Sequence, residues 1–292
     1  MKARRIAETF ADWAALAQAE PPQLARLGVL GASGWLRAVP EVELPRTVDG
    51  SVVGIFDDGY PAVLAGIANP PVLLWVDGML PADPGIAIVG TRTPTAFGHR
   101  VAQRAAREAV AAGHPVISGM SEGIDQAAEQ AAVTAGGVVI SVVGGGLDQV
   151  PPSLRAHREG ILANGGAIVS EQPPGTSPTR TTLDNRDRIQ SGLAHSVVIA
   201  QAGLRGGTIA TVRFTLVQGR RLIVPRPQAG TEHARTPASA LLLALTDPDG
   251  IDPQLLGLTG RHAATVANRR PVADVVAHTG DELATALRQP VA

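Results

Sequence analysis

Residues 86–92 read IAIVGTR, and this stretch decides the fold. In it, four apolar residues lead directly into a glycine, a threonine and an arginine. Similar apolar segments, each followed by a turn that contains glycine or serine, recur as far as residue 225. A nearly continuous apolar run is typical of a parallel strand that is buried on both faces. We therefore expect strands at 86–89, 115–117, 138–143, 167–169, 196–200 and 221–224.

Alanine-rich stretches that are long enough for helices separate these strands. Strands and helices in alternation predict βαβ units with right-handed crossovers. The predicted fold class is α/β, an open, mostly parallel Rossmann-like sheet with helices on both faces. The turns that follow the strands then gather along one edge of the sheet, where open α/β sheets bind their ligands.

Two smaller regions flank the predicted sheet. Apolar positions at helical spacing, interrupted by Pro21 and Pro22, predict a small helical N-terminal lobe over residues 1–50. The Rossmann-like domain is expected to span residues 51–246. The remaining residues, 247–292, predict a short C-terminal extension with a helix near 281–288.

Composition narrows the chemistry of this 292-residue chain. A net charge of −1 excludes a uniformly basic nucleic-acid coat, although it permits a local basic patch. Because the chain has no cysteine, disulfides, thiolate catalysis and cysteine-ligated zinc are excluded. The histidines lack metal-ligand spacing, so we expect neither a metal nor a cofactor. The absence of a membrane-length apolar stretch or a signal-peptide pattern predicts a soluble cytoplasmic protein.

The turn after the first of these strands predicts an anion site. Gly90, Thr91 and Arg92 supply free backbone amides, a hydroxyl and a guanidinium, and a helix is expected to follow from about residue 98. The alternative is a tight turn between strand and helix that merely exposes an arginine.

Two further strand ends are rich in small residues. Ser118, Gly119 and Gly123 let the backbone approach a ligand closely, while Asp125 either accepts from a sugar hydroxyl or braces its own loop. The next strand is followed by three glycines, Gly144, Gly145 and Gly146. They lack the G-x-G-x-x-G spacing of a dinucleotide site, so they favour close approach of the backbone to a phosphate without specificity for a dinucleotide.

Arginines follow at two more places. Arg186 and Arg188 lie in a segment that we expect to open a helix; alternatively, Asp184 caps that helix and Asp187 pairs with a neighbouring arginine. A second group directly precedes another predicted helix, whose amides point at the cleft: Arg205, Gly206, Gly207 and Thr208. Four guanidiniums, those of Arg92, Arg186, Arg188 and Arg205, are therefore expected to converge and to favour a polyanion or a nucleotide.

In their order along the chain, these motifs resemble the DprA/Smf family of DNA-processing proteins, over roughly residues 55–226. The matching blocks are YP at 60–61, NPPVLL at 69–74, VGTR at 89–92, SG at 118–119 with GID at 123–125, VGGGLD at 143–148 and SEQPPG at 170–175. The resemblance implies a Rossmann-like domain that binds single-stranded DNA, helps to load a RecA-type recombinase in transformation or recombination, and forms homodimers. It also adds Glu171, in the last block, to the expected site.

The chain departs from the family pattern at several positions. Leu183 stands in place of an aromatic residue, and Asp187 introduces an acid beside the two arginines. A stacked base is worth about 1–3 kcal/mol, which leucine does not supply in full. Glu129 replaces a histidine and Gln201 replaces a glutamate, so the chain resembles a divergent member of the family.

Two alternatives stay open at this point. The wider superfamily contains modules that bind small nucleotide ligands, and the two departures at 183 and 187 favour such a sensor. It also contains phosphoribohydrolases that cleave nucleoside monophosphates, but Thr211 stands where those enzymes carry a glutamate. Glu122, Asp125 and Glu171 show no evident acid–base partner from spacing, so we expect a protein without catalytic residues.

Overall fold

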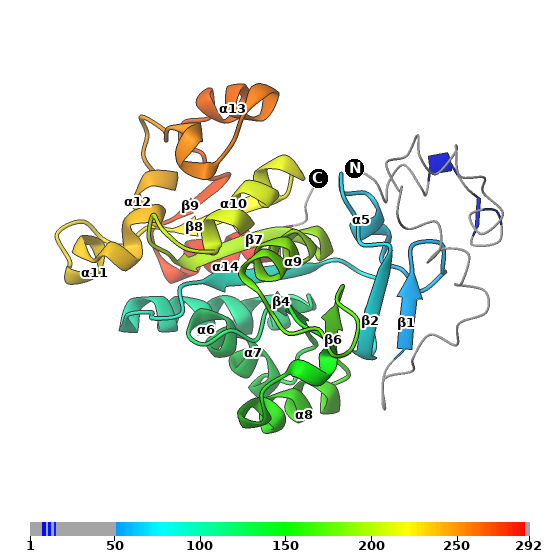
Figure 1. Cartoon of the computed structure of the whole chain (residues 1–292). Helices are drawn as coiled ribbons and strands as arrows, with labels where there is room; N and C mark the ends of the chain where they lie inside the picture. The colour runs from blue at the N-terminus through cyan, green and yellow to red at the C-terminus, as the bar shows by residue number, and fades with distance from the viewer. Residues whose placement is uncertain (1–7, 10, 13–14, 16–50, 290–292) are drawn as a thin grey trace.

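The computed structural model describes residues 8–9, 11–12, 15 and 51–289. Nearly all of the predicted N-terminal lobe, 1–50, lies outside the described residues. The described chain forms one sheet between two layers of helices (Figure 1).

The central six strands of the sheet confirm the predicted parallel core. They are β3 (Gly85–Gly90), β4 (Val116–Ser118), β5 (Val139–Val143), β6 (Ala167–Ser170), β7 (Ala194–Gln201) and β8 (Arg221–Pro225). They lie in the order β6-β5-β4-β3-β7-β8, and every neighbouring pair is parallel. The order reverses at β3, and a crevice at such a switch point is where open sheets of this class bind ligands.

Among the described residues, strands at both edges extend this core to a sheet of nine strands. β1 (Ser51–Gly54) and β2 (Leu73–Gly78) form an antiparallel pair, and β2 runs antiparallel to β6. At the other edge β9 (Val275–Ala277) pairs with β8 in parallel. The segment predicted as a C-terminal extension thus contributes a strand to the sheet, which its three residues are too few to signal by pattern.

The helices divide between the two faces of the sheet. One hydrophobic cluster joins the sheet to α5 (Ala62–Ala65), α9 (Arg180–Leu193), α10 (Thr208–Val217), α12 (Ala240–Leu245) and α13 (Gly260–Ala267). The other joins it to α6 (Ala96–Ala111), α7 (Ile124–Thr134), α8 (Arg155–Ala163) and α14 (Gly280–Arg288). Helices on both faces confirm the predicted fold class (Figure 1).

Short helical turns complete the fold. These are α11 (Glu232–Arg235), η1 (Leu147–Gln149), η2 (Pro152–Leu154), η3 (Pro237–Ser239) and η4 (Pro253–Leu256). Across the part of the chain that the structure describes, no helix combines the length and the apolar character needed to cross a membrane.

Small side chains bring the layer of α6 and α7 close to the sheet. In α6 the buried positions Ala102, Ala105, Ala106 and Ala109 recur at intervals of three and four, which is the spacing of one helix face. The opposite face of α6 is left for polar side chains, and this division shapes the site described next.

Candidate functional site

The turns after β3, β4 and β7 are tied together where these parallel strands end. The Thr91 amide donates to the Gln201 carbonyl at 2.8 Å, and the Ile124 amide donates to the Thr91 carbonyl at 3.1 Å. The Ser118 hydroxyl donates to the Ile88 carbonyl at 2.7 Å. The carboxyl edge of the sheet is therefore a cross-linked platform.

The turn after β3 requires its glycine and exposes its arginine. A Cβ at Gly90 would lie 2.5 Å from the Gln201 carbonyl oxygen and 2.6 Å from Ile124 Cγ1. Gly123, with φ of +88°, lies against the carbonyls of Thr91 and Arg92 in the same way. Arg92 extends to the surface from this rigid turn, so its guanidinium is available to a ligand.

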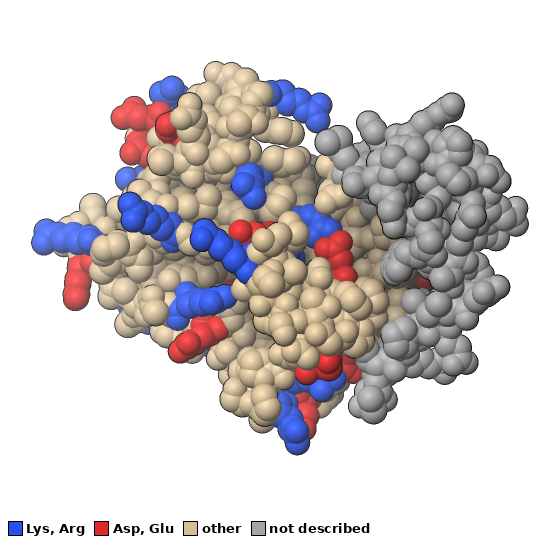
Figure 2. Space-filling view, in the orientation of Figure 1, with Lys and Arg blue, Asp and Glu red and all other residues tan. Residues whose placement is uncertain are grey.

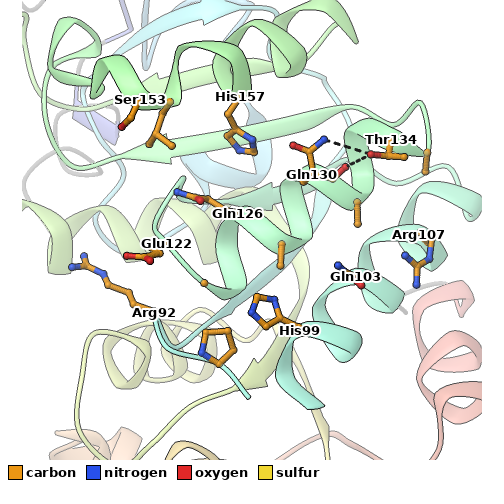
Figure 3. A pocket seen from close by; sticks show the side chains of 16 residues that line it. Arg92, His99, Gln103, Arg107, Glu122, Gln126, Gln130, Thr134, Ser153 and His157 are labelled. Atoms are coloured by element: carbon orange, nitrogen blue, oxygen red, sulfur yellow. Dashed lines mark hydrogen bonds between the residues drawn. The ribbon is translucent and has the colours of Figure 1, made fainter. Parts of the chain in front are cut away.

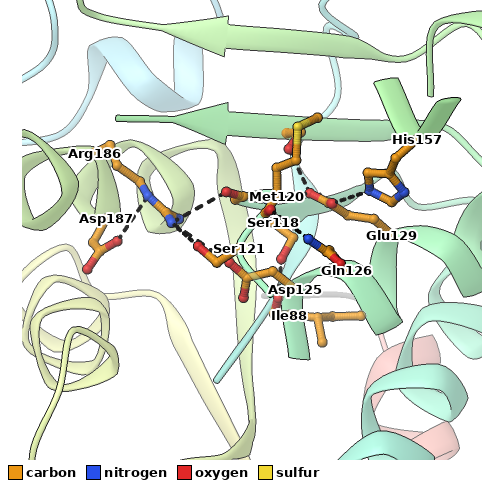
Figure 4. A network of polar contacts seen from close by, with 12 residues as sticks. Ile88, Ser118, Met120, Ser121, Asp125, Gln126, Glu129, His157, Arg186 and Asp187 are labelled. Carbon is orange, nitrogen blue, oxygen red and sulfur yellow. Dashed lines mark hydrogen bonds and ion pairs between the residues drawn. The ribbon is translucent and has the colours of Figure 1, made fainter. Parts of the chain in front are cut away.

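Arg186 lies inside the protein and braces the turn after β4 (Figure 4). It is 7% exposed, and its Nη2 donates to the Ser121 hydroxyl at 2.9 Å and lies 3.8 Å from Asp125 Oδ2. Its Nε lies 3.5 Å from Asp187 Oδ1. A Cβ at Gly119 would lie 1.9 Å from Arg186 Nη1, so this glycine makes room for the guanidinium.

The two carboxyls beside Arg186 are themselves buried. Burial raises the pKa of Asp125 to about 7, against the opposing effect of Arg186. Burial likewise raises the pKa of Asp187 to about 6, again opposed by Arg186. Desolvation favours the neutral form of a carboxyl group. Asp125 is thus enclosed beside Arg186 rather than exposed at the surface.

Glu129, at the position where the family has histidine, is satisfied by three donors (Figure 4). It is 0% exposed, and its Oε1 accepts from the Met120 amide at 3.0 Å and from the Ser141 hydroxyl at 2.7 Å. Its Oε2 lies 2.7 Å from His157 Nε2. These bonds hold Met120 at a φ of +58°, which is unusual for a residue with a side chain. His157 was not singled out by sequence reasoning, because its partner lies 28 positions away.

Gln201, at the position where the family has glutamate, uses both halves of its amide. Its Oε1 accepts from the Thr95 amide at 2.8 Å, and its Nε2 donates to the hydroxyls of Thr95 at 3.0 Å and Ser239 at 2.8 Å. Gly98 leaves space for this side chain, because a Cβ there would lie 2.4 Å from Gln201 Oε1. The neutral amide therefore fastens the start of α6 to β7.

Arg188 is also internal, and it forms an ion pair with Glu171. Its guanidinium donates to the carbonyls of Asn69 at 2.8 Å and Asn185 at 2.7 Å. The expectation that Asp184 opens or caps this helix is wrong, because α9 begins at Arg180 and Thr179 caps it through a reciprocal bond with Thr182. Arg186 and Arg188 therefore sit deep in the helix, where they turn inward.

The three glycines after β5 are covered by the chain itself. Gly144 packs against Leu183, since a Cβ there would lie 2.8 Å from Leu183 Cδ2. The Gly146 amide donates to the Thr176 carbonyl at 2.8 Å, and a Cβ at Gly145 would lie 2.9 Å from that oxygen. The close approach that these glycines permit is thus to residues 173–179 and α9.

The segment after β7 is open to solvent. Arg205, Gly206 and Gly207 are exposed, and Thr208 begins α10, which has no side-chain cap. The four expected guanidiniums do not converge on one surface, because Arg186 and Arg188 are buried while Arg92 and Arg205 are exposed. On the face shown in Figure 2, basic side chains project at separate points and form no single patch.

A groove that the sequence did not predict begins at Arg92 (Figure 3). It has a volume of about 860 Å³ and runs between α6 and α7, with α8 on its far side. Arg92 and Glu122 lie at one end, and Arg107 and Thr134 lie at the other. Its walls are polar stripes four residues apart along each helix: His99, Gln103 and Arg107 on α6, and Gln126, Gln130 and Thr134 on α7. This spacing is the signal that could have found the groove.

The groove contains more positive than negative charge. Arg92 and Arg107 line it as fixed cations, against one carboxylate from Glu122. Neither arginine forms an ion pair with another residue in the described ranges. Unpaired guanidiniums on an open groove suit phosphate oxygens, which they contact in bidentate fashion.

Known proteins resemble the part of the chain that forms β1 to β8. The family model for DNA recombination-mediator protein A matches residues 51–242. DNA processing protein DprA of Bacillus subtilis is 33% identical over 175 residues, which cover 59% of each chain. Protein Smf of Escherichia coli is 33% identical over 198 residues, which cover 66% of this chain and 53% of that protein. The chain thus spans little more than half the length of these curated relatives.

Two solved structures share the fold. DNA processing protein A of Streptococcus pneumoniae superposes with a TM-score of 0.63 at 22% identity, covering 82% of this chain and 94% of that one. DNA processing protein A of Helicobacter pylori, whose structure concerns its single-stranded DNA binding mode, gives 0.55 at 25% identity, with coverages of 62% and 82%.

Proposed function

Because this chain belongs to the DNA recombination-mediator protein A family, we propose that it binds single-stranded DNA and acts on DNA without catalysing a reaction. The observation that carries the proposal is the groove between α6 and α7, which begins at the exposed Arg92 and ends at Arg107. The similar Helicobacter pylori protein binds single-stranded DNA, which supports the same ligand here.

In this proposal phosphates lie on the exposed guanidiniums of Arg92 and Arg107, because the Thr91 and Ile124 amides already donate to carbonyls of the protein. Arg92 extends from a turn whose backbone geometry depends on Gly90 and Gly123. The position of its backbone is therefore fixed before a ligand binds. Contacts to phosphate carry no base information, so sequence preference is expected to be slight. Each neutralised phosphate releases counterions, so salt weakens binding.

Arg186, Arg188 and Glu171 act in this scheme through positioning rather than contact. Arg186 holds the turn at Gly119 and Ser121, and Arg188 joins α9 to Glu171 and to the Asn69 carbonyl. Both guanidiniums already lie against carboxyl groups, those of Asp125 and Asp187 at Arg186 and that of Glu171 at Arg188. They give the platform its shape, and the exposed arginines meet the DNA.

The cellular role that we propose follows the family. The protein takes part in DNA processing, in natural transformation or recombination, by helping to load a RecA-type recombinase in the cytoplasm. It acts as a homodimer. Both partner assignments rest on the resemblance of residues 55–226 to the family.

The positions of the carboxyl groups support the proposal that the protein does not catalyse a reaction. Thr211 occupies the position of the hydrolase glutamate and is buried. Asp125 is buried beside Arg186, and Glu171 is paired with Arg188. Glu122 alone among the three suggested acids lines the groove. General acid–base cleavage needs a second positioned group within reach. Glu122 is the one carboxyl among the groove-lining residues, and in the described part of the chain no hydrogen bond joins it to His99 or His157, which also line the groove.

A nucleotide sensor is the second candidate, because Leu183 is occupied by packing on Gly144 and offers a base no aromatic face. A mononucleotide that raises the melting temperature, with no effect of an oligonucleotide, would favour the sensor. The reverse pattern would favour DNA.

The direct test is fluorescence anisotropy of a labelled oligo-dT across a salt series. Wild type is compared with Arg92→Ala and Arg107→Ala, and with Arg261→Ala, an exposed arginine on α13 at the other face of the sheet. We expect micromolar or tighter binding, a log–log salt slope of about −0.7 per neutralised phosphate, and loss in the first two variants only. No binding at low salt would refute the proposal.

A further inference from the structure

A second hollow lies on the other side of α6 from the groove. It has a volume of about 360 Å³ and is bounded by α6, by the ends of β8 and β9, and by the start of α14. Its floor includes Pro225 and Ala277, the last residues of two adjacent parallel strands. The hollow therefore belongs to the carboxyl edge of the sheet, and its size lies within the range of small-ligand pockets.

The lining of this hollow is strongly basic. Arg100, Arg104 and Arg107 come from α6, Arg226 follows β8, and His278 follows β9. Arg104 is paired with Asp281 at 2.7 Å. Arg226 donates to the Thr246 carbonyl, which carries no formal charge. Within the described ranges, Arg100, Arg107 and Arg226 have no ion-pair partner, so the hollow holds an excess of positive charge.

The hollow is also shaped around its guanidiniums. A Cβ at Gly280 would lie 2.3 Å from Arg104 Nη1, so this glycine admits the Arg104 side chain beside the first turn of α14. The pairing of Arg104 with Asp281 then holds it in place. Arg100, Arg107 and Arg226 have no such carboxylate partner among the described residues.

An aromatic wall accompanies the charge. Phe97 lines the hollow, and its ring stacks on His233 with centroids 5.8 Å apart and planes 26° apart. Aromatic faces stack on nucleobases whatever their sequence. Phe97 thus brings to the hollow an aromatic side chain, which position 183 lacks.

The hollow and the groove meet at α6, because Gln103 and Arg107 line both. A chain of phosphates that follows the groove from Arg92 therefore reaches the hollow at Arg107.

We propose that this hollow binds one nucleoside phosphate, with its phosphate on Arg100 and Arg226 and its base against Phe97. The inference deepens the function proposed above and rests on it where the nucleotide is part of single-stranded DNA; a free nucleotide presents the same chemistry. Arg100 is the best probe, because it is exposed and has no bonded partner among the described residues.

The experiment compares wild type with Arg100→Ala, Phe97→Leu and the control Arg261→Ala, each first shown to be folded by circular dichroism. In oligo-dT anisotropy, Arg100→Ala is expected to flatten the salt slope by about 0.7, the share of one phosphate. Phe97→Leu is expected to weaken binding by about fivefold, with the slope unchanged. The Arg261 variant is expected to match wild type.

A photochemical cross-link shows whether a base lies against Phe97. Irradiation of the complex with a 5-iododeoxyuridine oligonucleotide is expected to modify Phe97, within the tryptic peptide 93–100. Millimolar thymidine monophosphate, tested by thermal shift, distinguishes the free nucleotide from DNA as the source.

The outcomes separate this inference from the function. If Arg92→Ala weakens oligonucleotide binding while Arg100→Ala and Phe97→Leu bind like wild type, the function stands and the hollow is refuted. If no oligonucleotide binds but thymidine monophosphate stabilises wild type and not Arg100→Ala, the DNA function fails and the hollow stands as a site for a free nucleotide. If neither ligand responds to Arg100 or Phe97, the inference is wrong.

Discussion

The turn network around Arg186 and the groove that begins at Arg92 use the same residue type in opposite ways. Arg186 is enclosed by Ser121, Asp125 and Asp187, whereas Arg92 extends from a rigid turn to an open surface. Both lie at the carboxyl edge of one sheet. The comparison teaches that an arginine near the carboxyl edge of the sheet either braces a turn inside the protein or remains exposed to a ligand. The residues around it in space, and not its sequence motif, decide between these two roles.

The largest effect is expected from Arg186→Ala. The substitution removes the partner of two buried carboxyls, and breaking a buried pair in this way costs about 3–5 kcal/mol. Chemical denaturation should show that loss in the free energy of unfolding. Under conditions where the variant is still folded, its affinity for oligo-dT should fall less than that of Arg92→Ala, because Arg186 shapes the turn at Gly119 and Ser121 but makes no phosphate contact. Full stability with lost affinity would instead make Arg186 a contact.

The next effect concerns pH and the same buried network. Because burial raises the pKa of Asp125 to about 7 in the folded protein, its proton stabilises the fold. That stability is fully present below the ordinary carboxyl pKa and is lost as pH rises through 7. At about 1.4 kcal/mol per unit, the loss is on the order of 2–4 kcal/mol between pH 4 and pH 8.

Asp125→Asn isolates this contribution, because the amide stays neutral at every pH. Denaturation at pH 5 and at pH 8 should show a smaller difference in unfolding free energy for the variant than for wild type. Asp187 contributes in the same direction in both proteins, since burial raises its pKa to about 6. Equal pH dependence in the two proteins would exclude Asp125 as the titrating group.

On the groove side, Arg92→Ala should act on binding alone. An exposed side chain without a bonded partner contributes within about 0.5 kcal/mol to stability. A lost charge-assisted contact is worth about 1.5 kcal/mol, or roughly tenfold in affinity. Anisotropy and thermal melts on the same samples check both numbers. A lowered melting temperature would place Arg92 with the internal arginines.

The smallest effect is expected from a change in the helix that carries the buried arginines. Thr179 caps α9, the helix that carries Arg186 and Arg188. Thr179→Ala should cost about 1 kcal/mol in unfolding free energy, the usual value of a helix cap. Oligonucleotide affinity should stay the same, because the first turn of α9 lies outside the groove. A loss of affinity would show that the setting of α9 controls the groove.

The residues of the core strands were predictable because apolar continuity and the turns that follow it are local properties. All six strands lie within two residues of their predicted limits. β9 was not predicted, since three residues between loops carry no period. The start of α9 was missed because the threonine cap at Thr179 lies five positions before Asp184, among residues that carry no other helical signal.

The sequence by itself determined the α/β sheet, the edge where its turns gather, and the exposed arginine after Gly90, because each depends on patterns within a few residues. Only the tertiary structure decided which charged side chains are buried and paired inside the protein. Glu129 and His157 meet across 28 positions, and Glu171 meets Arg188 across 17. It also decided the groove and the hollow, since both arise where α6 packs beside α7 and α14. Burial and pairing depend on what the fold places within a few ångströms, and no local pattern contains that information.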